Sequence, residues 1–315
     1  MDLESNTQQS NMQKWFSKQK YKFKQSRTLY VMFLLPAVYF IIFHYIPILG
    51  NVIAFQDYNV FDGFLHSEWV GFEHFKNFLS DPYFWKLVRN TVLINIYLLI
   101  FYFPMPIIFA LLLNELRFAL FKRFVQSVTY LPHFLSTVVV VGMLVNFLAM
   151  DGMLNRFIEA IGFQQIPFLS KADWFRTIYV GSEMWQRTGW GTILYLAALS
   201  SIDPSLYEAA KMDGANRWHR MIYITLPALI PVITILFLLT LGEILSVGFE
   251  KILLLYNGST YETADVIQTY VYRRGLLNSD FSYAAAVGLF QSILAFIAVI
   301  VANQATKKIN GNGLF

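Results

Sequence analysis

The sequence contains no cysteine, and only 14% of its 315 residues are charged. The missing cysteine excludes a disulfide framework, a thiol nucleophile and a thiolate metal site. So little charge excludes a disordered chain, and it is well below the roughly 25% found in ordinary soluble domains. In its place, 56% of the residues are hydrophobic and 17% are aromatic. These figures predict an all-α membrane protein rather than a soluble enzyme.

Several catalytic motifs are also absent from the sequence. No glycine is followed by lysine, so the chain has no phosphate-binding loop of the type Gly-x-x-x-x-Gly-Lys-Ser/Thr. It contains neither the His-Glu-x-x-His zinc motif nor the Gly-x-Ser-x-Gly nucleophile elbow, and its five histidines show no ligand-like pairing. We therefore expect no catalytic residue, no metal site and no cofactor in this chain.

The hydrophobic residues fall in six blocks of roughly twenty, which is the length that a helix needs to cross a bilayer. Proline interrupts four of the blocks, and membrane helices tolerate this because neighbouring helices can satisfy the freed carbonyl groups. The fourth block is the least hydrophobic because it contains Glu183, Gln186 and Arg187. The predicted transmembrane helices are Leu29–Leu49, Thr91–Leu113, Val128–Ala149, Ile178–Leu199, Ala228–Val247 and Tyr283–Asn303.

Lysine and arginine are distributed unequally between the connections. Fourteen lie in the two terminal segments and in the second-to-third and fourth-to-fifth connections, whereas nine, including Lys251, lie in the longer opposite connections. The positive-inside rule then places both termini in the cytoplasm. The predicted organisation is a basic cytoplasmic segment at 1–27, a six-helix transmembrane domain at 28–306 and a cytoplasmic tail at 307–315. The basic segment is expected to face lipid headgroups rather than nucleic acid.

Two of the opposite connections have amphipathic helical patterns. Hydrophobic and aromatic residues recur at helical spacing over Glu68–Asn90 and again over Asn155–Gly162. Both stretches are expected to form short helices at the membrane surface.

The connection at 202–227 has the pattern of two short helices outside the membrane. Asp203 or Ser205 can cap the first helix, and Ser205 with Glu208 matches a capping box. Gly214 suits the left-handed residue that ends a short helix, and Asn216 can cap the next one. Two alanines without bulk would let another protein approach closely. The residues expected to meet that protein are Glu208, Ala209, Ala210, Asp213, Gly214 and Arg217.

This connection resembles the signature loop of binding-protein-dependent ABC importer permeases. The signature is Glu-Ala-Ala, three residues, Gly, nine residues, Ile, one residue and Leu-Pro. Here it reads Glu208-Ala209-Ala210, Gly214, Ile224 and Leu226-Pro227, with no departure in spacing. The resemblance implies a type I ABC importer permease architecture in which this loop fits a cleft of a separate ATPase subunit.

Softer matches extend the resemblance over most of the chain. Val70-Gly71-Phe72, Asp81-Pro82 and Tyr130-Leu131-Pro132 are similar to segments of the carbohydrate branch, which includes maltose- and glycerol-phosphate-type permeases. Within that branch, the chain most resembles oligosaccharide permeases of Gram-positive bacteria.

The resemblance also implies partners and a location. These are a second permease, typically a different chain, two ATPase subunits that bind ATP and magnesium, an extracellular sugar-binding protein and the lipid of the bacterial cytoplasmic membrane. Two alternatives stay open at this point. One is an importer for a peptide, phosphonate or amino acid, and the other is a secondary transporter that works without ATP.

Polar side chains inside membrane helices are costly and usually face a cavity or one another. At a rise of about 1.5 Å per residue, those in the predicted spans fall in one layer in the outer half of the bilayer. Glu183 and Arg187, four residues apart, can form an ion pair that is structural or contacts substrate. Glu243 is a lone carboxylate that should bind sugar hydroxyls, pair with Arg187 or be protonated. The candidate substrate path consists of Asn95, Glu183, Gln186, Arg187, Trp190, Glu243 and Gln291.

Overall fold

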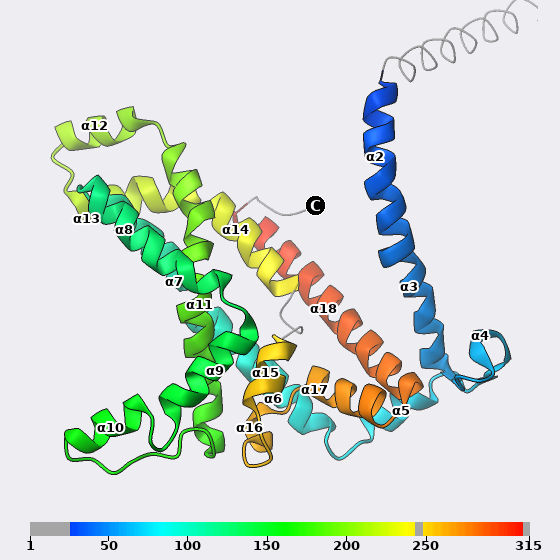
Figure 1. Cartoon of the computed structure of the whole chain (residues 1–315). Coiled ribbons are helices and arrows are strands. Elements are labelled where there is room, and N and C mark those ends of the chain that lie inside the picture. Colours follow the sequence, from blue (N-terminus) through cyan, green and yellow to red (C-terminus); the bar gives the residue numbers. More distant parts are fainter. Residues whose placement is uncertain (1–25, 243–247, 311–315) are drawn as a thin grey trace, which may run out of the picture.

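The computed structural model describes residues 26–242 and 248–310. The described residues are mostly helical, and one small sheet pairs two strands of two residues each. Helix α11 (Ala172–Ser200) runs from the end of the molecule that carries α10 (Met153–Ala160) to the end that carries α12 (Pro204–Met212), as Figure 1 shows. The end with α12 is called the hairpin end, because α12 belongs to the helical hairpin at residues 202–227, and the end with α10 is called the opposite end.

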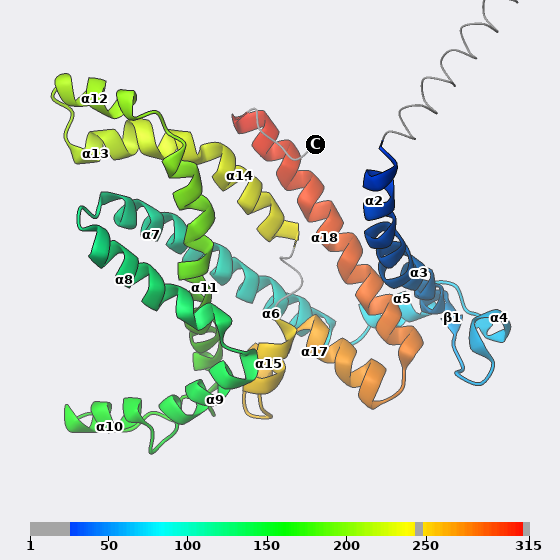
Figure 2. The same ribbon diagram turned by 45° about the horizontal axis from the view of Figure 1, so that its top comes forward.

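The first helical stretch stands apart from the rest of the molecule (Figures 1 and 2). Helix α2 (Arg27–Phe40) continues through a π-helical turn at Ile41–Tyr45 and α3 (Ile46–Leu49) into a 3₁₀ turn at Gly50–Phe55. No residue of α2 or α3 is buried, whereas the 3₁₀ turn packs against α18 (Phe281–Asn310). The apolar side chains of this stretch therefore need lipid or another chain to cover them.

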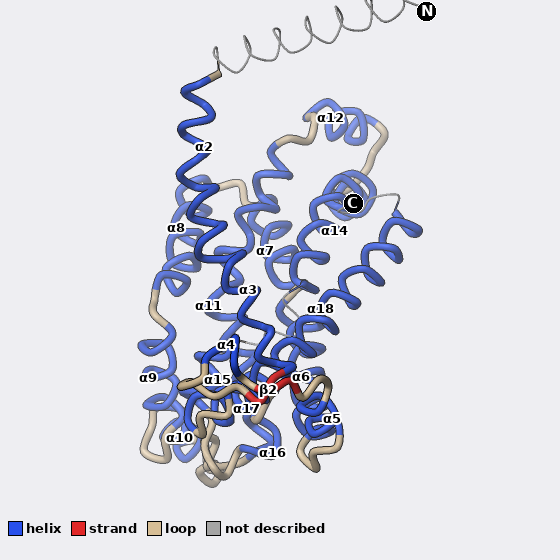
Figure 3. The backbone as a smooth tube through the Cα atoms, turned by 90° about the vertical axis from the view of Figure 1, so that its right-hand side faces the viewer, coloured by secondary structure: helices blue, strands red, loops and turns tan. Residues whose placement is uncertain are grey.

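The next connection contains the small sheet and one of the expected surface helices. Strands β1 (Gln56–Asp57) and β2 (Glu68–Trp69) pair antiparallel on either side of α4 (Gly63–His66), and Figure 3 shows them beside α5 (Glu73–Leu79). This pair of strands was not predicted from the sequence. Phe78 of α5 is buried in a cluster that includes residues of α18, so this helix packs on the bundle.

The predicted third span is wrong as a single helix. The structure has α8 (Ala119–Tyr130), a 3₁₀ turn at Leu131–Phe134 and then α9 (Thr137–Leu148). Pro132 lies in the turn, and Ser136 caps α9 by accepting the Val139 amide. A helix of 12 residues such as α9 is only about 18 Å long. In Figure 2, α9 follows the end of α8 after a change of direction, and the apolar stretch that is long enough to cross a membrane here is Thr137–Ala160.

Helix α11 is central to the bundle. Its 29 residues span about 43 Å, and it packs against α6 (Phe84–Tyr97), α7 (Pro104–Glu115), α8 and α14 (Leu226–Gly242). Gly189 faces the backbone carbonyl of Thr129 and Gly191 faces Pro106, so both glycines permit close helix contacts. A π-helical turn at Leu98–Tyr102 joins α6 to α7.

Five helical stretches are long and apolar enough to cross a membrane among the residues that the structure describes. The fourth predicted span lies in α11, which is long enough but is less apolar because of Glu183, Gln186 and Arg187. The six-span count stays a prediction. The five stretches are Arg27–Phe55, Phe84–Glu115, Thr137–Ala160, Arg217–Gly242 and Phe281–Lys308.

Candidate functional site

Local contacts form the hairpin between α11 and α14. The Ser205 amide donates to Asp203 Oδ1 at 2.9 Å, so Asp203 rather than Ser205 caps α12, and Pro204 is its first residue. The expected Ser205–Glu208 capping box does not form. Gly214 has φ of +78°, which confirms the left-handed position after the helix. The hairpin thus begins and ends where its cap residues predict.

The second arm of the hairpin is anchored to the membrane helix that follows. Asn216 caps α13 (Arg217–Arg220) by accepting the His219 amide at 2.9 Å, as the sequence predicts. A π-helical turn at Met221–Thr225 then leads into α14. The Tyr207 hydroxyl lies 3.0 Å from the hydroxyl of the buried Thr225, so α12 is fixed to the start of α14.

The surface of the hairpin is uncovered. All the residues expected to meet a partner are exposed except Ala210, which is half-buried and lines a hollow of about 370 Å³ with Asp213 and Gly214. Apolar residues beside them are also exposed, with Met212 at 88% and Tyr223 at 73%. No salt bridge between described residues occupies the charged positions. An exposed surface that combines apolar and charged groups in this way is a candidate docking surface.

The hydrogen bond that caps α12 also changes the pKa of Asp203. The hydrogen bond from the Ser205 amide stabilises the charged carboxylate and lowers the pKa of Asp203 below its ordinary value. The cap is therefore fully charged at neutral pH.

Buried charges form a cluster at the middle of α11. Glu183 lies 2.5 Å from Lys251 Nζ and 2.8 Å from Arg187 Nε. The side chains of Glu183 and Lys251 are 6% and 4% exposed, whereas that of Arg187 is 51% exposed. Gln186 accepts from Lys251 Nζ at 2.7 Å and donates to the Leu135 carbonyl at 3.2 Å. The structure thus confirms the predicted pairing of Glu183 with Arg187 and adds a second cation to it.

Lys251 is the member of this cluster that the sequence prediction missed. The sequence places it only in the connection between the fifth and sixth predicted spans, and the structure shows it there but buried against α11. Lys251 lies on α15 (Phe249–Leu255). The amide of Gly248, the residue before this helix, donates to the Tyr179 hydroxyl of α11 at 3.1 Å. The available signal was a lysine followed by the apolar run Ile252–Tyr256, but Glu250 precedes it and nothing in the sequence identifies Glu183 as its partner.

An open face of α11, formed by Arg187, Trp190, Leu194 and Ala197, continues from the cluster. Trp190 stacks on His133 with ring centroids 4.5 Å apart and planes within 3°, and Phe134 meets it edge-on. Trp190 is nevertheless 43% exposed. Because a half-exposed arginine facing lipid in mid-membrane is costly, this face should border a polar space or another subunit.

The remaining candidates for the substrate path do not join the cluster. Asn95 is buried on α6 and donates to the Thr91 carbonyl of its own helix at 2.6 Å. Gln291 lines a mostly apolar groove of about 940 Å³ between α18 and the segment of α15 and α17 (Ile267–Tyr272). Glu243 lies outside the described residues. The structure therefore brings together Glu183, Gln186, Arg187 and Trp190 of the predicted layer, but not the whole layer.

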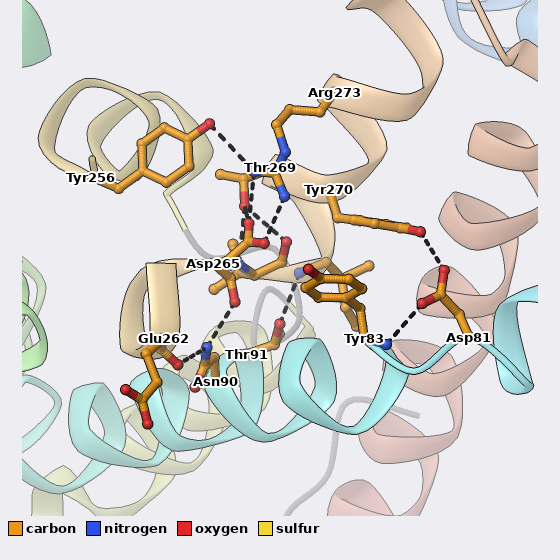
Figure 4. A network of polar contacts seen from close by, with 12 residues as sticks. Asp81, Tyr83, Asn90, Thr91, Tyr256, Glu262, Asp265, Thr269, Tyr270 and Arg273 are labelled. Carbon is orange, nitrogen blue, oxygen red and sulfur yellow. Dashed lines mark hydrogen bonds and ion pairs between the residues drawn. The ribbon is translucent and has the colours of Figure 1, made fainter. Parts of the chain in front are cut away.

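A second polar network, absent from the sequence prediction, lies at the opposite end (Figure 4). Arg273 donates to both carboxylate oxygens of the buried Asp265, at 2.8 and 2.6 Å, and lies over the Tyr261 ring. The Thr269 hydroxyl also donates to Asp265, at 2.7 Å. These bonds fix α16 (Tyr261–Ala264) and α17 to the start of the π-helical turn at 273–277.

The same network holds α6 and α11. Asn90 donates to the carbonyl groups of Glu262 and Asp265 and accepts from Arg176 of α11 at 2.9 Å. The Thr91 hydroxyl accepts the Ile267 amide at 3.1 Å, as Figure 4 shows. Elements from three parts of the chain are thereby joined beside the N-terminus of α11.

The described residues thus form a bundle of long apolar helices with an exposed hairpin at one end, and they contain no potential metal site. Residues 102–310 match the family described as the binding-protein-dependent transport system inner membrane component. The chain belongs to this family and is therefore an all-α membrane permease subunit.

Similar proteins extend the match to almost the whole chain. The polygalacturonan/rhamnogalacturonan transport system permease protein YteP and protein LplB, both of Bacillus subtilis (strain 168), are each 46% identical over 93% of this chain and 92% of their own. A chain in the crystal structure of a bacterial alginate ABC transporter, in complex with an alginate pentasaccharide-bound periplasmic protein, is 41% identical. It has a TM-score of 0.86 over 93% of this chain and 98% of its own. The type I importer permease fold is thus confirmed.

Proposed function

We propose that this permease imports an oligosaccharide that an extracellular binding protein delivers. The exposed hairpin at residues 202–227 carries the proposal, because it presents the signature residues on a surface that no other part of the described chain covers. The relatives named for polygalacturonan, rhamnogalacturonan and alginate transport support a sugar substrate. They favour it over a peptide, phosphonate or amino acid, and family membership argues against a secondary transporter.

In this proposal, energy enters through the hairpin. A separate ATPase subunit binds ATP and magnesium and takes the hairpin into a cleft, where Ala209 and the hollow beside Gly214 allow close approach. Glu208, Asp213 and Arg217 then supply charges to that contact. Because α12 is fixed to α14 through Tyr207 and follows directly from α11, movement of the ATPase reaches both helices.

The substrate path in this proposal follows the open face of α11. Trp190 offers an indole that can stack on the apolar face of a pyranose ring, and Arg187 and Gln186 offer hydrogen-bond donors nearby. Asn95 and Gln291 are retained as polar residues of the path, each at its own position, and Glu243 as a sequence-based candidate.

The proposal includes a second permease, and the exposed first helical stretch supports it. Its side chains are exposed along α2 and α3, and lipid or a further chain would cover them. We expect the complete importer to contain a second permease of different sequence, two ATPase subunits and the binding protein at the opposite end. The hairpin end, the basic segment at 1–27 and the tail at 307–315 would then face the cytoplasm.

Gly214 provides the test of coupling. Gly214→Val places a β-branched residue at φ of +78°, whereas Gly214→Asn is tolerated better in the left-handed region. In proteoliposomes containing the complete importer, we expect Gly214→Val and Glu208→Ala to lower ATP-driven uptake about tenfold, the equivalent of about 1.4 kcal/mol. Gly214→Asn should retain more uptake than Gly214→Val. A purified complex without an ATPase subunit, together with normal uptake by all three variants, would show that the proposal is wrong.

A further inference from the structure

We propose that the charged cluster on α11 makes the path selective for anionic sugars, with Arg187 binding the carboxylate of a uronic acid residue. This inference rests on the proposed function and specifies its substrate class. It follows from the charges and hydrogen-bonding groups of the described residues, starting from the cluster itself.

The first step is the charge of the cluster. Glu183 contributes one negative charge and is in contact with two cations, Lys251 and Arg187. Lys251 is almost completely buried, and its other contact in the cluster is the neutral Gln186. A buried ammonium needs a carboxylate nearby, so Lys251 neutralises Glu183. The cluster therefore retains one positive charge, and the exposed guanidinium of Arg187 carries it.

The second step is the orientation of that guanidinium. Glu183 engages Arg187 through Nε, at 2.8 Å, on one edge of the planar group. No hydrogen bond from Nη1 or Nη2 to another described residue is present, and half of the side chain is exposed. These two nitrogens form the fork that binds a carboxylate in a bidentate manner. Glu183 thus holds the arginine while leaving its most specific binding edge free.

The third step is the neighbouring ring. Trp190 follows Arg187 by three residues, so both side chains lie on the same face of α11. His133 stacks on the indole and fixes its plane. A pyranose ring on the exposed part of the indole would place a ring carboxylate within reach of the guanidinium fork. A neutral sugar would use the ring but leave the surplus charge without a partner, which is costly inside a membrane protein.

Binding to the assembled permease–ATPase complex tests this inference without the selectivity of the binding protein. Saturation-transfer NMR would compare trigalacturonate with the same trimer after methyl esterification of its carboxylates. We expect the wild-type complex to bind the acid at least about tenfold more tightly than the ester, because charge-assisted hydrogen bonds contribute about 1.5–3 kcal/mol. Arg187→Gln should remove that preference, and Arg187→Lys should retain part of it.

A charge-matched series separates the effect of charge from a structural effect. Lys251→Met leaves no net charge in the cluster and should also abolish the preference for the acid. The double variant Glu183→Gln/Lys251→Met restores the single positive charge on Arg187 and should recover the preference. Equal binding of acid and ester by the wild type, or an unchanged preference in Arg187→Gln, would overturn the inference. Loss in the double variant equal to that in Lys251→Met would overturn it as well.

Uptake by the complete importer distinguishes this inference from the proposed function. If neutral and acidic oligosaccharides are imported equally well, only the charge selectivity is wrong. If no oligosaccharide is imported and another class of solute is, the proposed function fails with it.

Discussion

The hairpin of α12 and α13 and the charged cluster on α11 are both polar sites in a mostly apolar chain, yet they are built in opposite ways. The caps of the hairpin join residues two or three positions apart, and all of its charged side chains except the half-buried Arg220 are exposed. In the cluster, Lys251 contacts Gln186 across 65 positions, and both side chains are buried. Among the described residues, the charged side chains of the hairpin form no ion pair, whereas those of the cluster bind one another.

This difference separates two uses of charge. An exposed charged residue that binds a partner protein can be substituted at little cost to the stability of the fold, because water already solvates its charge. A buried charge cannot, because removal of its partner leaves an uncompensated ion. The comparison predicts large effects on stability for the cluster and the opposite-end network, and small ones for the hairpin.

The largest effect is expected for Lys251→Met. This variant leaves Glu183 buried with only the half-exposed Arg187 as its counterion, at a cost of about 3–5 kcal/mol. Thermal unfolding of the purified complex in detergent would measure the loss. The control is Glu183→Gln/Lys251→Met, which buries neither charge and should recover most of the stability. Equal losses in the single and double variants would contradict the role of the ion pair.

The next largest effect is expected for Asp265→Asn in the network of Figure 4. The variant weakens two bonds to Arg273 and one to Thr269 at a buried position, and we expect a loss of about 2–3 kcal/mol. Asp280→Asn is the matched control, because its 3.8 Å pair with Arg274 is partly exposed and should contribute less than about 1 kcal/mol. Denaturation midpoints of the two variants would be compared. A larger loss for Asp280→Asn would reverse the proposed ranking.

A smaller effect is expected where α11 and α8 approach closely. A Cβ at Gly189 would overlap the backbone carbonyl of Thr129, so Gly189→Ala should cost about 1–3 kcal/mol as the helices separate. Gly181 of the same helix has nothing near its Cβ position, so Gly181→Ala should be neutral or slightly stabilising. The yield and melting temperature of both variants would be measured. A loss in Gly189→Ala alone supports close packing of α11 on α8, whereas a loss in both would show that α11 does not tolerate alanine in general.

The smallest effect is expected at the cap of α12. Asp203→Ala should increase amide hydrogen exchange in α12, whereas Asp203→Asn should not, because asparagine also caps helices. The folded state lowers the pKa of Asp203, so the stabilisation is present above the unfolded value of about 3.9 and disappears as the pH falls through the folded value. The protection factors of these amides, which are corrected for the intrinsic pH dependence of exchange, should therefore not change in the wild type between pH 5 and pH 8. A change within that range would show that another group controls the hairpin.

The sequence predicted the hairpin well because its determinants are local. Caps, a glycine and a proline act within a few residues, and the structure differs only in using Asp203 in place of the Ser205–Glu208 box. The third span was predicted as one helix because hydropathy continues through Pro132, although the backbone does not.

Contacts between residues far apart in the chain could not be predicted from the sequence. Glu183 and Arg187 could be paired because they are one turn apart, but Lys251 could not be placed, since only the packing of α15 on α11 brings it there. The contacts of Asn90 with Asp265 and Arg176 depend in the same way on tertiary structure.

The two helices that enter and leave the hairpin differ in stiffness. Helix α11 has no proline and ends three residues before α12 begins, so it can act as a rigid lever from Ser200 to Arg187, about 20 Å away. Helix α14 contains Pro231 and begins after a π-helical turn, both of which let a helix bend. A push on the hairpin would therefore tilt α11 as a rod and flex α14. Tilting of α11 would then displace the guanidinium of Arg187, whereas α14 would bend.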